Sequence, residues 1–374
     1  MSDIAGGIAS DVGPVEAEIR RRIAAAGPMP VAEYMQLALT LPQHGYYVTR
    51  DPLGTDGDFI TAPEISQMFG ELIGLWMAAT WKQQMGAPGN VRIVELGPGR
   101  GTMMLDALRA AQVMPGFREA VTLHFVEVSP ALQQQQEQAF LGSKLPASWH
   151  ASLDDVPREG PAIILANEFF DALPVHQAVR QADGWYERLI DIDADGIFVF
   201  TLAREPLRNF DTILPPQVRA APEGVVFEWR TDTTAMEIGR RIAHTGGAAL
   251  IIDYGHAQSG FGETLQAVGG HAFADTLTAP GTCDLTAHVD FQALGDAASA
   301  MGCKVFGPIV QSELLGRLGI RTRAAALKAG RPSKAAEVDA ALARLIGHGR
   351  TGMGELFKAI ALADPKLGVP PGFD

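Results

Sequence analysis

Three glycines at alternate positions are the first residues in this sequence whose spacing suggests chemistry. Gly97, Gly99 and Gly101 follow the apolar run Val91–Leu96 and precede Thr102–Ala111, whose spacing predicts a helix. A glycine backbone adopts positive φ angles readily and lets a ligand approach without meeting a Cβ. A strand, a glycine turn and a helix in this order are typical of a nucleotide-binding loop, although a simple glycine turn has the same spacing.

A carboxylate beside the loop indicates which nucleotide it would bind. Glu95 stands two residues before Gly97, at the expected carboxyl end of the strand. Its negative charge would repel a pyrophosphate over the loop, whereas it would attract a cation such as the amino group of a methionine moiety. In addition, Thr102 stands where the dinucleotide fingerprint has its third glycine, so the fingerprint of NAD-binding proteins is incomplete here. The pattern therefore favours S-adenosylmethionine over NAD as the cofactor.

Acidic residues further along are candidates for binding the rest of this cofactor. Glu127 lies near the end of the apolar run Leu123–Val128, where an acid can accept hydrogen bonds from both ribose hydroxyls. A solvated acid at a strand end is the alternative interpretation. Asp154 follows a short predicted strand near Trp149 and is a candidate acceptor for the adenine amino group. A surface turn explains Asp154 equally well.

Polar and acidic residues also follow the predicted strand Ala162–Ala166. Asn167, Glu168 and Asp171 would face the same crevice as the glycine loop, because ligands of open α/β sheets bind outside the carboxyl ends of the strands. A carboxylate there can orient a guanidinium and can accept a proton from a nitrogen nucleophile. The first turn of a helix uses the same residue types. We favour a catalytic role because the pair Phe169–Phe170 would wall a pocket.

The elements that must position these residues alternate in type along the chain. Short apolar runs without polar alternation predict buried parallel strands, and the segments between them have helical spacing. The four clearest predicted strands are Val91–Leu96, Leu123–Val128, Ala162–Ala166 and Ala248–Ile252. Strands that alternate with helices predict an α/β fold with a Rossmann-like, doubly wound sheet. The 374 residues exceed one typical domain, so additions to this sheet are expected.

The N-terminal addition is predicted to be helical. We assign residues 1–85 to a helical and lid segment that precedes the catalytic domain of residues 86–374. Its predicted helices are Val15–Ala26, Val31–Leu39 and Glu64–Gln84. The long loop Gln43–Pro63 separates the last two, and Phe59–Ser66 is a candidate lid over the cofactor.

A second addition lies inside the catalytic domain, at about residues 175–230. Its predicted strands are Val175–Val179, Trp185–Ile192 and Ile197–Leu202. Asp-Gly turns separate them, which predicts an antiparallel, β-rich region for the substrate. Near the C-terminus, residues 322–347 predict a helix rich in alanine, lysine and arginine.

Composition argues against several other classes of protein. The chain has 43 acidic and 30 basic residues, and its net charge of −13 makes a nucleic-acid partner unexpected. Cys283 and Cys303 are too few for a disulfide framework or a four-thiolate zinc site. The patterns of zinc peptidases, serine hydrolases and P-loop enzymes do not occur, so no metal is predicted. His256, after the last predicted strand, is an alternative base.

Targeting signals are not predicted either. The N-terminus has no basic region followed by an apolar run, and it carries several acids. The longest apolar runs fall far below the roughly 18 residues of a membrane span. These features predict a soluble, cytoplasmic protein without direct membrane insertion. The oligomeric state is left open, with a homodimer as one alternative.

Several longer motifs resemble those of the MidA-like family of S-adenosylmethionine-dependent methyltransferases. They occur in order, and the similarity extends over residues 43–358. The motifs are Gly57–Gln67, Glu95–Thr102, Val126–Pro130, Ala166–Pro174, Ile252–Gly255, Pro280–Phe291 and Met353–Lys358. The family is related to a mitochondrial complex I assembly factor. The resemblance therefore implies a class I methyltransferase fold with S-adenosyl-L-methionine as cofactor.

The same resemblance implies an activity and a partner. The implied activity is protein-arginine methylation, with symmetric dimethylation of an arginine on an NADH dehydrogenase (complex I) core subunit in support of complex assembly. The resemblance places Gly97, Gly99 and Gly101 in the cofactor loop and Glu127 at the ribose. The closely spaced glutamate pair of better-known arginine methyltransferases is not found, and Glu168 with Asp171 is its nearest substitute.

Three alternatives of other classes stay open at this point. The chain could be an assembly chaperone that binds the cofactor without catalysis, or a methyltransferase for small molecules. A nicotinamide-dependent oxidoreductase is the third, and Glu95 and Thr102 argue against it.

Overall fold

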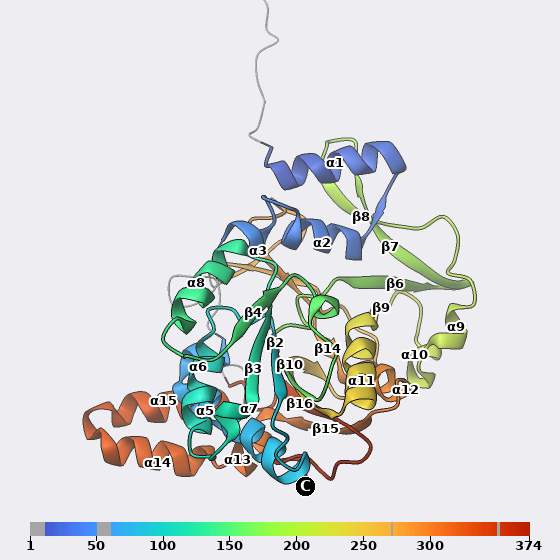
Figure 1. Ribbon diagram of the computed structural model, residues 1–374. Helices are drawn as coiled ribbons and strands as arrows, with labels where there is room; N and C mark the ends of the chain where they lie inside the picture. Colours follow the sequence, from blue (N-terminus) through green and yellow to red (C-terminus); the bar gives the residue numbers. More distant parts are fainter. Residues whose placement is uncertain (1–11, 51–60, 271, 350–351) are drawn as a thin grey trace, which may run out of the picture.

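Eight strands form the central sheet of the computed structural model, which describes residues 12–50, 61–270, 272–349 and 352–374 (Figure 1). Seven of them follow one another in the order β15 (Lys304–Val310), β16 (Phe357–Ala363), β10 (Gly247–His256), β5 (Ala162–Asn167), β2 (Val91–Leu96), β3 (Val121–Val126) and β4 (Ala147–His150). The short β14 (Val289–Asp290) pairs with the end of β10. Strands β10, β5, β2, β3 and β4 are parallel, whereas β16 is antiparallel to both its neighbours.

Helices cover both faces of this sheet. One face carries α5 (Gln67–Ala79), the π-helical turn Thr80–Gln84, α6 (Thr102–Ala111), α7 (Phe117–Ala120), α8 (Pro130–Phe140) and α13 (Gln311–Arg317). The other face carries α11 (Thr233–Thr245) and α12 (Phe291–Ala300). Successive strand residues alternate between the two cores, as Ile163 and Ile164 do, which is the pattern of a doubly wound sheet.

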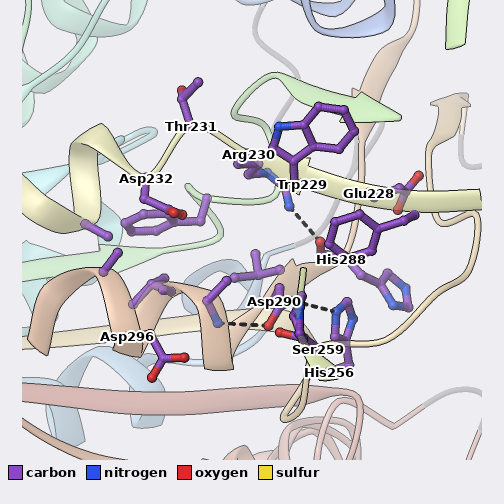
Figure 2. Close-up of a pocket in the computed structure, with 18 of the residues that line it drawn as sticks. Glu228, Trp229, Arg230, Thr231, Asp232, His256, Ser259, His288, Asp290 and Asp296 are labelled. Carbon is purple, nitrogen blue, oxygen red and sulfur yellow. Dashed lines mark hydrogen bonds and ion pairs between the residues drawn. The ribbon is translucent and has the colours of Figure 1, made fainter. Parts of the chain in front are cut away.

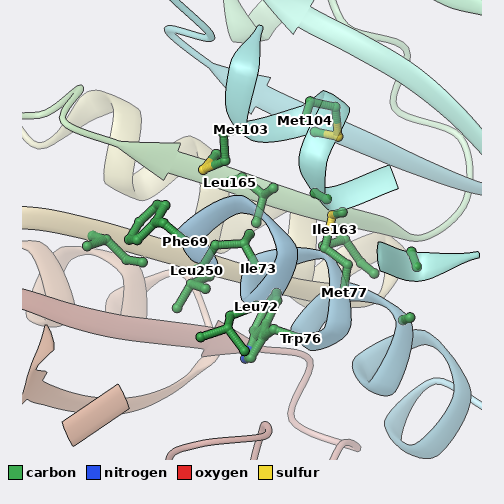
Figure 3. Packing of buried hydrophobic residues seen from close by; sticks show 14 of the residues in the cluster. Phe69, Leu72, Ile73, Trp76, Met77, Met103, Met104, Ile163, Leu165 and Leu250 are labelled. Carbon is green, nitrogen blue, oxygen red and sulfur yellow. The ribbon is translucent and has the colours of Figure 1, made fainter. Parts of the chain in front are cut away.

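The larger core lies between α5, α6 and the sheet. Figure 3 shows Phe69, Leu72 and Trp76 of α5 over Leu165 and Leu250 of the sheet. The helices α5 and α6 approach closely because Gly74 has no side chain at their contact. A Cβ at that position would collide with the backbone of Ala107. This tight contact fixes α6, whose N-terminus follows the glycine loop.

A second, antiparallel sheet stands beside the first (Figure 1). Its strands are β1 (Met29–Pro30), β7 (Gly184–Ile192), β6 (Val175–Gln181) and β9 (Val226–Arg230), with β8 (Phe198–Leu202) paired to β7. Two N-terminal helices, α1 (Pro14–Ala26) and α2 (Val31–Thr40), pack on it, and α9 (Phe210–Ile213) and α10 (Pro216–Arg219) follow β8. The N-terminal segment therefore shares a core with the insertion, because β1 pairs with β7 and Val31 packs near Ile190.

Shorter elements surround the carboxyl ends of the central strands. They are α3 (Tyr46–Thr49), α4 (Ala62–Ile65), the 3₁₀ turn Leu153–Asp155, and a small sheet of β11 (Gln266–Gly269), β12 (Ala272–Ala274) and β13 (Asp284–Thr286). A helical hairpin of α14 (Ile320–Gly330) and α15 (Ala335–Ile346) extends away from the sheet at the lower left of Figure 1, with the 3₁₀ turn Pro332–Lys334 between its helices.

The α/β, doubly wound fold is confirmed, as are the predicted strands of the central sheet and the three strands of the insertion. Three expectations need correction. The antiparallel β16 was not predicted, the helix of residues 322–347 is the pair α14 and α15, and Glu64–Gln84 is divided among α4, α5 and a π-helical turn. The proposed lid Phe59–Ser66 begins outside the described residues, and the division at residues 85 and 86 stays a prediction.

Candidate functional site

A cavity of about 380 Å³ opens beside the glycine loop, at the carboxyl ends of β2, β3 and β5. We call it the main cavity. Side chains that line it include Tyr47, Glu127, Leu153, Glu168, Asp171, Tyr254 and Asp284. A smaller loop cavity of about 60 Å³ adjoins the same glycines and is lined in part by Glu64, Glu95 and Asn167. Glu168 lines both cavities, so the predicted catalytic and cofactor residues largely share one site.

The glycine loop presents bare backbone to both cavities. Gly97, Gly99 and Gly101 have φ angles of 62°, 56° and 79°, and Gly101 begins α6 in the left-handed conformation. A Cβ on Gly97 would lie 2.9 Å from the ring of Phe169. From α8, the side-chain Nε2 of Gln136 donates a hydrogen bond of 2.6 Å to the carbonyl of Gly99. The loop therefore has a fixed shape that only glycines can adopt without strain.

Glu95 brings a buried carboxylate to the loop cavity. The residue is 2% exposed, and its Oε2 has no hydrogen-bond partner within the described residues. Burial raises the pKa of Glu95 to about 8, because the charged form loses water and gains no cation. Buried polar atoms of native proteins nearly always have a partner. This oxygen therefore indicates a ligand with a cationic or N–H group, and the amino group of S-adenosylmethionine fits.

Glu127 lines the main cavity after β3 and is held in place by neighbours on α8. Its Oε1 accepts a hydrogen bond of 2.8 Å from the backbone of Ser129, and its Oε2 accepts one of 3.1 Å from Gln136. Trp149 in turn donates to Gln136 at 2.9 Å. Burial raises the pKa of Glu127. The carboxylate is thus fixed at the position expected of a ribose acceptor.

Asp154 does not line the main cavity, which corrects its proposed position at the adenine. Its side chain is 71% exposed and pairs with Arg158 at 2.6 Å. The short 3₁₀ turn points this carboxylate to solvent, whereas the preceding residues Ser152 and Leu153 face the cavity. Leu153 therefore offers an apolar surface where the sequence suggested a polar acceptor.

The turn after β5 is built around one buried carboxylate, that of Asp253 in β10. Its Oδ2 accepts hydrogen bonds from the backbone N–H groups of Phe169, Phe170 and Asp171, at 2.9 to 3.2 Å. Glu168, with a positive φ of 51°, donates its own N–H to the carbonyl of Ile252. Asp253 is fully buried. It acts as a positioning residue that turns the Asn167–Asp171 segment toward the cavities.

Glu168 stands at the centre of the site. Its Oε1 accepts hydrogen bonds from the backbone N–H of Ala62 at 2.9 Å and from the amide of Asn167 at 3.2 Å. Burial raises the pKa of Glu168 to about 7, and the negative charge of Asp171 adds to the rise. The Oδ1 of Asn167 has no partner within the described residues. An acid with this pKa can accept a proton near neutral pH.

Asp171 lines the main cavity and is hydrogen-bonded to the hydroxyl of Tyr254. We call the part of the cavity lined by Glu168, Asp171 and Asp284 its acidic end. Burial raises the pKa of Asp171. The nearby guanidinium of Arg230 does not pair with this carboxylate. It donates instead to the backbone carbonyls of Asp171, Leu173, Ala287 and His288. Arg230 therefore joins two loops around the cavity and leaves the Asp171 side chain facing it.

Two residues of the acidic end were not predicted from the sequence. The hydroxyl of Tyr47 donates to the two carboxylate oxygens of Asp284 at 2.8 and 2.9 Å, and both residues line the main cavity. Asp284 belongs to a long motif of the family resemblance, and Tyr47 to a long loop, which were the available signals. Their contact could not be predicted because 237 residues separate them.

The alternative base His256 lies outside the main cavity. It lines a separate cavity of about 310 Å³, which we call the second cavity, and stands 3.6 Å from Asp290 (Figure 2). Within the described residues, no group of three or more His, Cys, Asp and Glu side chains is arranged to hold a metal ion. No helix in the described ranges is both long and apolar enough to cross a bilayer.

Comparisons with known proteins show the family to which the chain is similar. The model of an S-adenosyl-L-methionine-dependent methyltransferase family matches residues 72–309. The chain is 41% identical over 327 residues to the protein arginine methyltransferase NDUFAF7, mitochondrial, of Danio rerio, with 81% of this chain and 76% of that protein covered. The Homo sapiens protein of the same name is 38% identical over 353 residues, with 86% and 77% covered.

A solved structure shows the cofactor product on the same fold. It is a protein from Burkholderia thailandensis, described as a methyl transferase and bound to S-adenosyl-homocysteine. The two chains are 29% identical, superpose with a TM-score of 0.82, and are covered over 96% and 94% of their lengths. The unpartnered oxygen of Glu95 and the bare glycine loop fit such a ligand. This chain belongs to the MidA-like family of S-adenosyl-L-methionine-dependent methyltransferases.

Proposed function

We propose that this enzyme methylates the guanidinium of an arginine in a protein substrate. The observation that carries the proposal is the acidic end of the main cavity. Asp171 is buried and Glu168 is half-buried; both line the cavity and form no ion pair within the described residues. Buried carboxylates without a cation are costly, so a cationic group of the substrate would stabilise them. A planar guanidinium can also donate two hydrogen bonds to one carboxylate.

The residues divide into those for the cofactor and those for the substrate. Glu95, Gly97 and Gly99 would hold the methionine part of S-adenosylmethionine, and Glu127 its ribose. Gly101 lines neither cavity and shapes the loop where α6 begins. When bound, this cofactor supplies a methyl group on a positively charged sulfur, which leaves as a neutral thioether with the electrons of the broken bond.

The side chains around the substrate nitrogen orient the guanidinium and remove its proton. Glu168 and Asp171 align the guanidinium and draw positive charge away from the nitrogen that attacks the methyl. As the new N–CH₃ bond forms, that nitrogen loses a proton, and Glu168 in its ionised form accepts it. Asn167 holds the Glu168 carboxylate by its amide, 3.2 Å from Oε1.

The finer assignment rests on the family resemblance. We propose symmetric dimethylation of an arginine on an NADH dehydrogenase core subunit, in support of complex I assembly, in the cytoplasm. The names of the relatives support arginine methylation in those proteins. The net charge of −13 favours a substrate segment that carries positive charge.

The test is methyl transfer from labelled S-adenosylmethionine to a purified NADH dehydrogenase core subunit, with the product site located by mass spectrometry. The variant Glu168→Gln should slow the transfer at least about 100-fold, because it removes the proton acceptor. Its affinity for S-adenosylhomocysteine should stay within about twofold. The exposed Glu223→Gln is the matched control.

Two results would contradict the proposal. Full activity of the Glu168→Gln variant would remove Glu168 from the mechanism. Cofactor binding without methyl transfer to any arginine of the subunit would favour a non-catalytic assembly role.

A further inference from the structure

The second cavity lies on the other side of the turn that carries Asp171. Its volume is about 310 Å³, and Leu173 lines both it and the main cavity. The walls come from β9, the start of α11, the end of β10, β14, α12 and α9 (Figure 2). It is therefore built where the inserted sheet meets the methyltransferase sheet, next to the proposed site of the substrate arginine.

Aromatic side chains form one wall of the second cavity. Phe210 and Phe227 are buried, and the ring of Trp229 stacks between Phe227 and His176 at interplanar angles of 10° and 17°. The edge of the cavity carries Ile213, which is 71% exposed. Both ring faces of Trp229 are therefore covered, and the wall offers apolar contact to the aliphatic stem of a guest.

Carboxylates form the opposite wall. Asp290 caps α12 through the N–H of Ala293 at 3.0 Å and lies 3.6 Å from His256. Asp232 and Asp296 also face the cavity, and their side chains form no hydrogen bond or ion pair within the described residues. Burial raises the pKa of Asp232 to about 6, and the charges of Asp290 and Asp296 add to the rise.

The cations already present offset these acids only in part, since the charge of Arg230 lowers the pKa of Asp232 without an ion pair between them. Arg230 lines the second cavity, but its guanidinium donates to four backbone carbonyls. His256 is engaged by Asp290. The solvent-exposed Asp232 and Asp296 carboxylates repel each other and have no ion-pair partner within the described residues. A positively charged guest would relieve that repulsion.

We propose that the second cavity binds another lysine or arginine side chain of the same polypeptide whose arginine enters the main cavity. This inference rests on the proposed function and adds a specificity site to it. Charge complementarity decides the occupant, because an aromatic wall facing unpaired carboxylates suits a long cationic side chain. The shared Leu173 places the two side chains on either side of one turn.

Binding is tested first, without any need for catalysis. The protein is labelled with 5-fluorotryptophan, and the ¹⁹F resonance of Trp229, identified with Trp229→Phe, reports on the second cavity. N-acetyl-lysine amide and N-acetyl-arginine amide should shift this resonance at millimolar concentrations, whereas the uncharged N-acetyl-norleucine amide should not. The double variant Asp232→Asn/Asp296→Asn should weaken binding about tenfold.

These substitutions should leave folding intact, because Asp232 makes no side-chain cap on α11 and both residues are exposed. A melting temperature equal to that of the parent protein verifies this. Asp193→Asn, on an exposed turn of the insertion, is the control. An equal shift by the uncharged probe, no shift by either cation, or unchanged binding by the double variant would each overturn the proposal.

Substrate selection is tested second, with arginine peptides that carry or lack another basic residue at varied spacing. The double variant should raise KM for the best two-cation peptide about tenfold more than for the single-cation peptide. An equal rise in KM for both peptides would indicate a general electrostatic attraction to the acidic surface and would overturn the proposal. Dissociation of a protein dimer by the double variant would also overturn it. If no peptide is methylated, the proposed function fails, and the Trp229 titration still decides whether the second cavity binds cations.

Discussion

The two ends of the main cavity are assembled in different ways. At the cofactor end, Glu95, the glycine loop and Glu127 come from consecutive elements, β2 to α8, and hold one another through short contacts such as Gln136 to Gly99. At the acidic end, Tyr47 and Asp284 meet across 237 residues of sequence. The turn at Asp171 is held there by side chains of β9 and β10.

We propose that this difference separates binding of the cofactor from recognition of the substrate. The cofactor end needs only the sheet and its two adjacent helices. The acidic end exists only when the N-terminal segment, the insertion and β13 are all folded against the sheet. Substitutions at one end should therefore leave the other end largely intact, and each prediction below tests that independence.

The largest effect is expected for Glu95→Gln, at the cofactor end. Losing a buried charge that faces the cofactor amino group should weaken binding of S-adenosylhomocysteine roughly 10- to 100-fold by calorimetry. The acidic end should still bind an arginine peptide normally. A cofactor affinity within twofold of the parent protein would show that Glu95 does not contact the ligand.

The same substitution should have the opposite effect on stability of the free protein. The folded-state pKa of Glu95, about 8, lies above its ordinary value of 4.5. Its contribution to stability is therefore full below about pH 4.5 and is lost as the pH rises toward 8. Glutamine cannot ionise, so Glu95→Gln should be more stable than the parent by roughly a few kcal/mol at pH 8, and much less so at pH 5. Denaturant unfolding at both values measures this, and an equal difference at both would contradict it.

A smaller loss is expected for Asp253→Asn, at the acidic end. Asparagine has one acceptor oxygen, so it cannot accept both the three backbone N–H groups at Oδ2 and the N–H of Tyr254 at Oδ1. We expect unfolding free energy to fall by about 3 kcal/mol and methyl transfer to fall with it, because the turn that carries Glu168 loosens. Cofactor affinity, measured below the new melting temperature, should change by less than about threefold. A parallel loss of cofactor affinity would show that the two ends are one unit.

The cofactor end was largely predictable from sequence because its contacts are made between elements that are consecutive in the chain. Contacts between neighbours in the chain leave a local pattern, so the glycine loop, Glu127 and the bounds of β2 could be read from residues 91–127. The acidic end left only partial signals. Asn167, Glu168 and Asp171 follow a strand and were found, whereas Asp253, which positions them, looks like any residue of a buried strand.

Other differences have equally local causes. The helix expected over residues 322–347 is interrupted because Pro332 disfavours helix at the residue before it, and a 3₁₀ turn follows. The strand β16 was missed although four glycines, Gly347, Gly349, Gly352 and Gly354, separate it from the helical hairpin. Its run Phe357–Ala363 contains three alanines and a lysine, residue types that are depleted in strands. Both elements approach the site. The charge of Arg344 in α15 lowers the pKa of Glu168, and Phe357 of β16 packs against Tyr254, which lines the main cavity.

A moderate effect is expected for Asp284→Asn. The substitution keeps a hydrogen-bond acceptor for Tyr47 but removes one buried charge from the acidic end. KM for the arginine substrate should rise about tenfold, with kcat reduced less than threefold. The reason is that the Asp284 charge attracts the guanidinium but takes no part in the proton transfer. Tyr47→Phe, which leaves the carboxylate in place, should raise KM less. A change in cofactor affinity instead would show that Asp284 acts at the cofactor end of the cavity.

The smallest effect is expected for Asp154→Asn, and it sharpens the comparison from the cofactor end. The carboxylate pairs with Arg158 in solvent, and exposed pairs of this kind contribute little. Cofactor affinity and activity should therefore change by less than about twofold.

Leu153 is the matched test, because it is buried and lines the main cavity where Asp154 does not. Leu153→Ser should weaken S-adenosylhomocysteine binding measurably more than Asp154→Asn, since it removes apolar surface from the adenine side. If Asp154→Asn were the more damaging of the two, the 3₁₀ turn would have to rotate when the cofactor binds, and the cofactor end would be less preformed than its contacts indicate.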